Sequence, residues 1–319
     1  MILFWTVVTA ALFLVLFLLL LILLLVSRAL FRMGIERKGN FSSGSGNFAQ
    51  QLAAHKEMLS RGEALYESLE KIPVEIRSFD GLWLRGHAIC TGESKKTVIL
   101  VHGYRSSGIR DFSGIIPFYW DAGFNILLID QRAHGESEGD YITFGVRERR
   151  DVLSWARFAV EFFGADHSLI LDGISMGATS VLMACALELP AQVRGIVADS
   201  GFVSPHDIFS SVLKNQFHLG TFPLLNMTER LAARRAGFRF GEASTLTAMA
   251  SNAIPVLFVH GGADDFVPVE MTLASYEACS ATKALVIVPG AAHACGYLID
   301  PVRCETALRE FFGRIFKNE

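Results

Sequence analysis

The hydrophobic positions of this chain follow three different patterns. The first 26 residues form one uncharged apolar run in which Thr6 and Thr9 are the polar side chains. Residues 48–71 then carry apolar side chains on one helical face. From Pro73 onward, short apolar runs of strand length alternate with longer segments of helical periodicity. The pattern predicts an N-terminal helix followed by a globular domain of the α/β class.

The N-terminal apolar run is long enough to cross a membrane. As a helix it would reach about 39 Å at about 1.5 Å per residue, against about 30 Å for the hydrocarbon core. A cleaved signal peptide would begin with a basic segment and end at a small-residue cleavage site, and the run shows neither. A buried core helix is the other alternative, which the uniform apolarity disfavours. We therefore predict a transmembrane anchor over residues 1–27.

Basic residues follow this run. Arg28, Arg32, Arg37 and Lys38 come after it, whereas only the α-amino group precedes it. The positive-inside rule then places the rest of a single-pass membrane protein on the cytoplasmic side. The same four residues are suited to contact anionic lipid headgroups. Five cysteines, an odd number without metal-type spacing, are consistent with a reducing compartment.

Domain boundaries follow from changes in composition. Residues 28–47 are basic and then rich in Gly and Ser, which predicts a linker. Residues 48–72 are predicted as an amphipathic helix that either packs on the globular domain or lies along the membrane surface. The globular domain is predicted over residues 73–319, as one α/β unit with an insertion at 201–252.

The alternation after Pro73 predicts a mostly parallel sheet flanked by helices, with right-handed crossovers. It opens with a hairpin of residues 74–78 and 82–90 around an Asp80-Gly81 turn. Six further strands are predicted at 97–101, 125–129, 168–171, 193–198, 254–260 and 284–288. Helices are predicted near 110–120, 147–163, 176–189, 270–279 and 302–317.

A serine flanked by glycines lies where the strand at 168–171 gives way to a helix. The segment reads Gly173-Ile174-Ser175-Met176-Gly177. Such a segment is a nucleophile elbow, in which the backbone turns sharply to lift the hydroxyl out of the sheet. Small flanking residues let the strand and the helix pass closely. We therefore predict Ser175 as a nucleophile.

A serine nucleophile needs a base to take its proton and a carboxylate to orient that base. The expected chain order is Ser, acid, His, with each side chain just past the C-terminal end of a strand. Asp264 follows the strand at 254–260, and His293 follows the strand at 284–288. We predict Asp264 as the acid, with Asp265 as its rival, and His293 as the base.

Three other residues of suitable chemistry are predicted to be structural. His134 and His260 lie in turns after strands, where a histidine commonly satisfies backbone groups. Cys295 lies two residues from His293, but it has no elbow and is predicted to pack as a small side chain.

An acyl-transfer site also needs two backbone N–H donors for the oxyanion. One is expected directly after the nucleophile, and the other in the loop after an earlier strand. His102-Gly103-Tyr104 follow the strand at 97–101. We therefore predict the N–H groups of Tyr104 and Met176 as the two donors.

These blocks together resemble the α/β-hydrolase superfamily over about residues 74–317. The likeness rests on residues 102–104, 130–137 and 173–177, and on 260–264 with 290–293. Within the superfamily the chain resembles bacterial single-pass membrane hydrolases and eukaryotic ABHD-type depalmitoylases and lipid hydrolases. In such families the second block is a structural turn, usually with Gly where Ala133 stands here. The resemblance implies that the insertion at 201–252 is a small helical lid over Ser175.

The predicted triad and the resemblance together imply a membrane-anchored serine hydrolase, of the carboxylic-ester class, with no cofactor and no metal. Its substrate is expected to be a small-molecule ester, thioester or lipid with an apolar acyl part. The aromatic residues of the lid either line that pocket or form the lid's own core. A serine aminopeptidase-like peptidase and a catalytically idle scaffold are the alternative functions. The net charge of −3 argues against a nucleic-acid partner, and the oligomeric state is not predicted.

Overall fold

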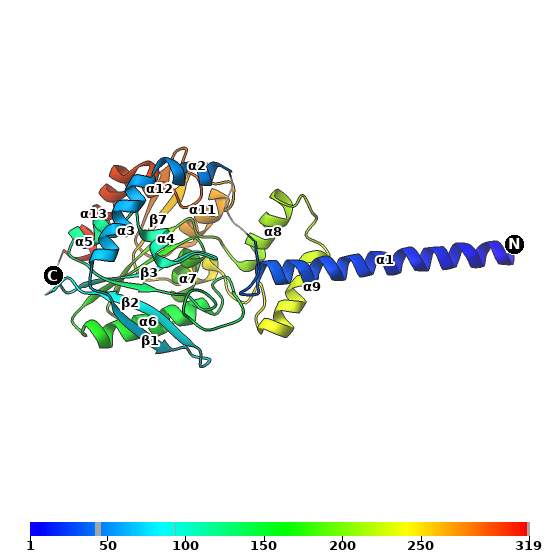
Figure 1. Cartoon of the computed structure of the whole chain (residues 1–319), viewed down its shortest axis with the longest axis horizontal. Helices are drawn as coiled ribbons and strands as arrows, with labels where there is room; N and C mark the ends of the chain where they lie inside the picture. The colour runs from blue at the N-terminus through cyan, green and yellow to red at the C-terminus, as the bar shows by residue number, and fades with distance from the viewer. Residues whose placement is uncertain (42–45, 93, 318–319) are drawn as a thin grey trace.

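The globular part of the chain is built on one central sheet. A computed structural model describes residues 1–41, 46–92 and 94–317. Its sheet has eight strands in the order β1-β2-β4-β3-β5-β6-β7-β8. Figure 1 shows this sheet inside a body covered by helices, from which one long helix, α1, projects.

The sheet is antiparallel at one edge and parallel elsewhere. β1 (Ile72–Arg77) and β2 (Trp83–Ile89) form a hairpin, and β2 pairs antiparallel with β4 (Asn125–Ile129). The parallel strands are β3 (Lys96–Val101), β5 (Ser168–Ile174), β6 (Val193–Asp199), β7 (Val256–Gly261) and β8 (Lys283–Val288). All eight predicted strands are present. Every residue of β4, β5 and β7 is buried, because both faces of the sheet are covered.

Helices pack on both faces of the sheet. One face carries α6 (Glu148–Phe163), α7 (Met176–Ala184) and α11 (Val269–Ala278). The other face carries α4 (Gly108–Phe112), α5 (Ile116–Asp121) and α13 (Pro301–Ile315). α7 ends at Ala184, five residues before its predicted end. The single-turn α12 (Gly296–Ile299) was not predicted, because four residues carry no periodic pattern.

Two predicted helices are each broken into two. The helix predicted near 110–120 is α4 followed by α5, and the helix predicted at 48–72 is α2 (Gly46–Ala54) followed by α3 (Lys56–Ser68). α3 packs against α5, with Gly62 so close to the Ser113 carbonyl that a Cβ atom would overlap it. The breaks allow this contact while α2 packs on α12. The segment at 48–72 therefore packs on the domain.

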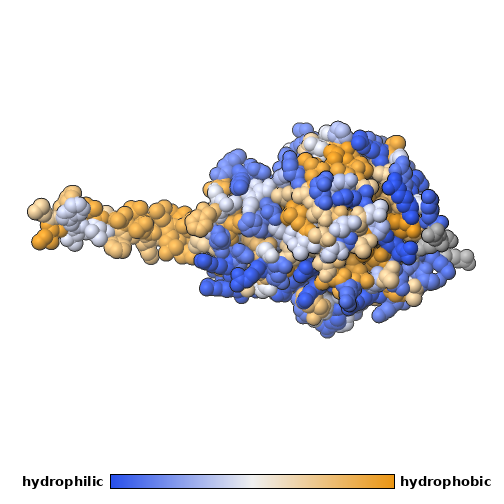
Figure 2. All heavy atoms as spheres, turned by 180° about the vertical axis from the view of Figure 1, so that it is seen from behind, coloured by the Kyte–Doolittle hydropathy of each residue, from blue (hydrophilic) through white to orange (hydrophobic). Residues whose placement is uncertain are grey.

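α1 (Ile2–Gly34) continues beyond the predicted anchor. Residues 28–34, which were predicted as part of a linker, are helical, because Phe31 and Gly34 are buried against the insertion. The remaining predicted linker includes residues 42–45, which lie outside the described residues. By length and composition α1 could cross a membrane, and its most apolar stretch is not buried in the protein. Figure 2 shows it as a hydrophobic rod that projects from a body whose surface carries both hydrophilic and hydrophobic residues.

The insertion between β6 and β7 lies where α1 meets the domain. It contains α8 (Pro205–Asn215), α9 (Leu224–Leu231), the π-helical turn η1 (Ala232–Ala236) and α10 (Thr245–Ala250). α9 packs along α1, as Figure 1 shows. Phe209, Phe238 and Phe240 are buried together in the insertion's own core, and Phe209 also lines a cavity that reaches Ser175.

Candidate active site

Ser175 lies at the sharp turn between β5 and α7. Its backbone has φ +57° and ψ −115°, a conformation that an L-residue adopts only at a cost. A Cβ atom on Gly177 would overlap the Val101 carbonyl, and one on Gly173 would overlap the backbone of Gly177. Glycines are thus required on both sides of the serine by the close approach of β3, β5 and α7. The local geometry is that of the elbow predicted from the sequence.

The three residues predicted as a triad come together in space. His293 Nε2 lies 2.9 Å from Ser175 Oγ, and His293 Nδ1 lies 2.7 Å from Asp264 Oδ2. Three strand ends position these residues: Ser175 follows β5, Asp264 follows β7 and His293 follows β8. Ser175 and His293 are each 6 % exposed, so the pair is shielded from bulk water yet open to a cavity.

Both oxygen atoms of the Asp264 carboxylate have polar partners. Its Oδ1 accepts hydrogen bonds of 2.9 Å from the N–H groups of Phe266 and Val267, and its Oδ2 lies 3.2 Å from His260 Nε2. Burial alone would raise its pKa, but the charges and hydrogen bonds of His293 and His260 hold it well below its usual range. The rival residue Asp265 is exposed and forms no hydrogen bond or ion pair with another described residue.

The protonation of His293 is set by the same contact. Burial alone would lower the pKa of its imidazole, but the Asp264 charge and hydrogen bond outweigh burial and raise it. A carboxylate at Nδ1 favours the tautomer with the proton on that atom, which leaves Nε2 free to accept a proton from Ser175. This arrangement can act as a general base.

Of the three residues predicted to be structural, His260 also contacts the triad through Asp264, whereas His134 and Cys295 form no hydrogen bond with it. His134 Nε2 accepts a hydrogen bond of 2.9 Å from the Arg105 N–H, and burial lowers the pKa of His134 to about 3. His260 Nδ1 lies 2.7 Å from Thr272 Oγ1. Cys295 is buried, which raises the pKa of its thiol to about 12 and so leaves no thiolate near neutral pH.

Two backbone N–H groups near the serine have no hydrogen-bond partner among the described residues. Among the described residues, neither the Tyr104 nor the Met176 N–H donates a hydrogen bond. The residues on either side of Tyr104 are fixed, because the Gly103 N–H bonds Asp111 Oδ2 at 2.7 Å and the Arg105 N–H bonds His134. Asp111 was missed by sequence reasoning, since a carboxylate in a loop carries no motif. This loop is rigid where an oxyanion would need it to be.

Sequence comparisons find a hydrolase family. A family model described as "Serine aminopeptidase, S33" matches residues 92–236. The uncharacterized protein YqkD of Bacillus subtilis (strain 168) is 26% identical over 246 residues, covering 77% of this chain and 80% of that protein. The uncharacterized protein YfhR of Salmonella typhi is 28% identical over 229 residues, covering 67% and 71%.

Solved structures of similar fold include an esterase. The Pyrococcus furiosus esterase Pf2001 superposes with a TM-score of 0.62 at 25% identity, covering 78% of this chain and 92% of that chain. Est1E of Butyrivibrio proteoclasticus, solved with ferulic acid, superposes with a TM-score of 0.57 at 20% identity, covering 77% and 100%. The chain has the α/β-hydrolase fold. Taken with the family model, the comparisons identify it as a hydrolase of that fold.

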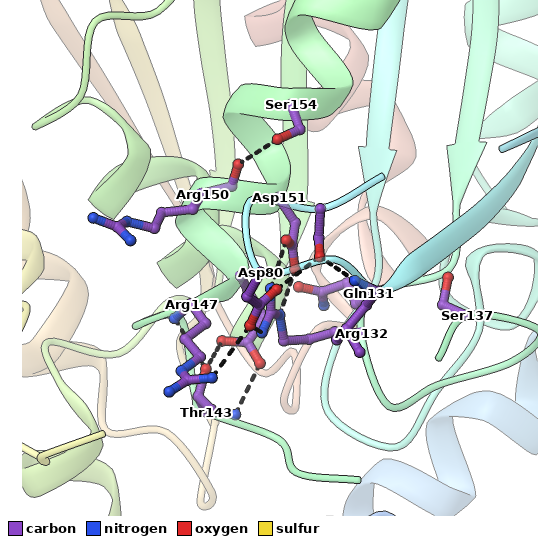
Figure 3. Close-up of polar contacts among 12 residues, drawn as sticks. Asp80, Gln131, Arg132, Ser137, Thr143, Arg147, Arg150, Asp151 and Ser154 are labelled. Carbon is purple, nitrogen blue, oxygen red and sulfur yellow. Dashed lines mark hydrogen bonds and ion pairs between the residues drawn. The ribbon is translucent and has the colours of Figure 1, made fainter. Parts of the chain in front are cut away.

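The turn after β4 in this α/β-hydrolase is held by a buried arginine. Arg132 donates to Asp151 at 2.5 and 2.7 Å and to Asp80 at 3.0 and 3.1 Å, and Arg147 also reaches Asp80 (Figure 3). The network ties the β1–β2 turn to α6. Ala133 has φ +59°, a backbone conformation that glycine adopts more readily than alanine.

Two cavities of the α/β-hydrolase domain meet at Ser175. The larger, about 280 Å³, is lined by Ser175, His293 and the buried carboxyl groups of Asp172 and Asp199. Burial raises the pKa of Asp172 to about 7, although the Tyr119 hydroxyl donates to it at 2.6 Å. The smaller, about 50 Å³, is lined almost entirely by apolar side chains.

Sequence reasoning missed the two buried acids. Asp172 directly precedes the elbow and Asp199 ends the next strand, so a charged residue within each apolar run was the available signal. As for metals, the described residues hold no group of three or more His, Cys, Asp or Glu side chains arranged to bind one.

Proposed function

We propose that this chain is a membrane-anchored serine hydrolase that cleaves carboxyl esters or thioesters with an apolar acyl part. The observation that carries the proposal is the continuous hydrogen-bonded series from Ser175 through His293 to Asp264. Each of these groups has the neighbour that its role requires, and no described residue competes for the serine hydroxyl.

The proposed reaction proceeds through an acyl-enzyme. His293 Nε2 takes the hydroxyl proton as Ser175 Oγ attacks the carbonyl carbon, and Asp264 stabilises the imidazolium that forms. The N–H groups of Tyr104 and Met176 bind the oxyanion. His293 then gives its proton to the leaving oxygen or sulfur as the bond to the acyl group breaks. A water molecule activated by His293 releases the acid and restores Ser175.

Two features support the apolar acyl part and the anchor. The smaller cavity at Ser175 is walled by Phe144, Phe202, Phe209 and other apolar side chains. Most side chains of α1 from residue 2 to residue 25 are apolar and exposed, and such a surface is solvated poorly by water and accommodated by a bilayer. The basic residues that follow place the domain on the cytoplasmic side under the positive-inside rule.

An aminopeptidase is the second candidate. The matching family model is described as a serine aminopeptidase, and the larger cavity holds Asp172 and Asp199 within the space beside Ser175. Ionised, these carboxyl groups could hold a substrate ammonium group. Their burial raises the pKa of both, which weakens that role at neutral pH.

A paired substrate panel tests the proposal. The full chain in detergent is offered p-nitrophenyl esters from short to long acyl chains, and aminoacyl anilides in parallel. We expect ester turnover that falls by about 10⁶-fold in Ser175→Ala, the size seen when a serine nucleophile is removed. Ser154→Ala, a serine on α6 outside the site, is the matched control and should leave turnover unchanged. Anilide turnover without ester turnover would establish the peptidase instead.

A further inference from the structure

The last turns of α1 form one wall of the apolar cavity at Ser175. This smaller cavity, called the slot below, is lined by Leu30, Met33 and Gly34 of α1 and by Phe209 and Val212 of α8. Ser175 lines it as well. A Cβ atom on Gly34 would lie 3.2 Å from the Phe209 ring, so the two helices approach closely there. The helix that qualifies as a membrane span is therefore also part of the site.

With α1 spanning a membrane, the slot would lie at the depth of the lipid headgroups. Leu25 is the last exposed large apolar residue of α1, and Leu30 is the first residue of α1 that lines the slot. At about 1.5 Å per residue, the five residue steps from Leu25 to Leu30 span about 7.5 Å along the helix. The polar layer on each side of the hydrocarbon core is about 5 to 8 Å thick. An apolar slot at this depth opens toward the acyl chains of the adjoining leaflet.

The α8–α9 loop carries exposed apolar residues beside the same helix. Phe222 is 82% exposed, and Phe217 and Leu219 are more than a third exposed. This loop ends at α9, which packs along α1 (Figure 1). Large exposed aromatic and aliphatic side chains next to a membrane span are typical of segments that enter the membrane interface.

Exposed basic side chains lie on α1 and on the insertion that packs against it. Arg28 of α1 and Arg234 and Arg235 of η1 are exposed and form no ion pair with another described residue. Arg235 lies 6.0 Å from the Phe31 ring of α1, which places it at the junction of α1 and the insertion. Such residues attract anionic lipid headgroups and hold this face against the leaflet.

We propose, on the basis of the serine-hydrolase function above, that a lipid ester enters laterally from the leaflet between α1 and α8. Its carbonyl reaches Ser175, its polar part occupies the larger cavity, and its acyl chain trails through the slot into the bilayer. A slot of about 50 Å³ is sufficient because only part of the chain lies in it at one time. Ser175 Oγ bonds to the acyl carbon, the ester C–O bond breaks, and the alcohol leaves with the proton from His293.

Two esters with the same leaving group distinguish an effect on substrate entry through the slot from an effect on the hydrolytic reaction. The full chain is placed in vesicles of phosphatidylcholine and phosphatidylglycerol, with p-nitrophenyl palmitate in the bilayer or p-nitrophenyl acetate in water. In Gly34→Leu the added side chain fills the slot. We expect the palmitate-to-acetate rate ratio to fall about tenfold or more, the size of effect that a misfit side chain has in an apolar substrate pocket.

Matched variants make the result decisive. Ala29→Leu adds the same side chain to an exposed position on α1 and should leave the ratio unchanged. Val212→Trp narrows the slot from α8 and should lower the ratio as Gly34→Leu does. An unchanged ratio in both slot variants would overturn the lateral route, as would equal loss of both esters in both. The lateral route would also be overturned if a soluble S-palmitoyl peptide were hydrolysed as fast as p-nitrophenyl palmitate in vesicles and Gly34→Leu did not change that rate. A wild-type protein inactive on both esters would instead refute the hydrolase function itself.

Discussion

At the scale of single residues, Asp264 and Asp172 show how position decides what a carboxyl group does. Asp264 accepts four hydrogen bonds or close contacts and has a lowered pKa, so it stays ionised beside His293. Asp172 is equally buried but has one donor, Tyr119, and its pKa is raised to about 7. The sequence predicted the first from chain order. It did not predict the second, because burial in a cavity wall is set by tertiary packing.

The base function of His293 predicts a pH effect at Asp264. Because a base must be neutral to accept a proton, activity should rise with pH through the raised pKa of His293. Asp264→Asn removes the charge that raises this pKa, so the acid limb should move to lower pH while kcat falls by about 10⁴. The measurement is kcat/KM for a p-nitrophenyl ester against pH. Asp265→Asn is the control and should leave the profile in place; the reverse pattern would make Asp265 the acid.

The raised pKa of Asp172 predicts a pH-dependent stability. The unfolded carboxyl loses its proton near pH 3.8, whereas the folded one keeps it to about pH 7. The folded state therefore binds more protons over this range, and stability falls as pH rises through it. Asp172→Asn should raise the melting temperature more at pH 8 than at pH 5. Asp121→Asn, on an exposed residue of α5, should show no such difference. A gain that is the same at both pH values would contradict the assignment.

At the scale of elements, strands were predicted better than helices. Each strand is a short apolar run bounded by turn residues, and all eight were found, including the Asp80-Gly81 hairpin. Helix ends depend on tertiary contacts that the sequence does not display. α1 extends to Gly34 because Phe31 and Gly34 find partners on the insertion, and the helix predicted at 48–72 breaks at His55 to follow the domain surface.

The candidate site was predicted from the order of the strands and the residues at their ends, and not from side-chain packing. Ser175, Asp264 and His293 each follow a strand end, and parallel strands bring those ends to one edge of the sheet. Chain order and the strand ends were therefore sufficient to predict that these three residues lie together. The contribution of α1 to the slot could not be predicted, because nothing in a uniformly apolar run shows which turn will face a cavity.

At the scale of the whole molecule, the anchor, the insertion and the site form one unit. α1 leads from its exposed apolar length to the slot, α8 and α9 close around it, and the strand ends carry the reactive groups beneath. Under the membrane anchoring and the serine chemistry proposed above, this arrangement places Ser175 close to the bilayer surface. The proposed arrangement also explains why α1 packs against the domain through buried contacts and is not merely linked to it covalently.

The central claim is that Ser175 is an activated nucleophile, and covalent labelling tests it most directly. Fluorophosphonates react with a serine whose proton is taken by a base, whatever the natural substrate. The full chain in membranes should be labelled at one site, Ser175, as located by peptide mass spectrometry. Labelling should be lost in Ser175→Ala and strongly slowed in His293→Ala. Absence of labelling in the wild type, or labelling at another serine, would contradict the account and favour a catalytically idle scaffold.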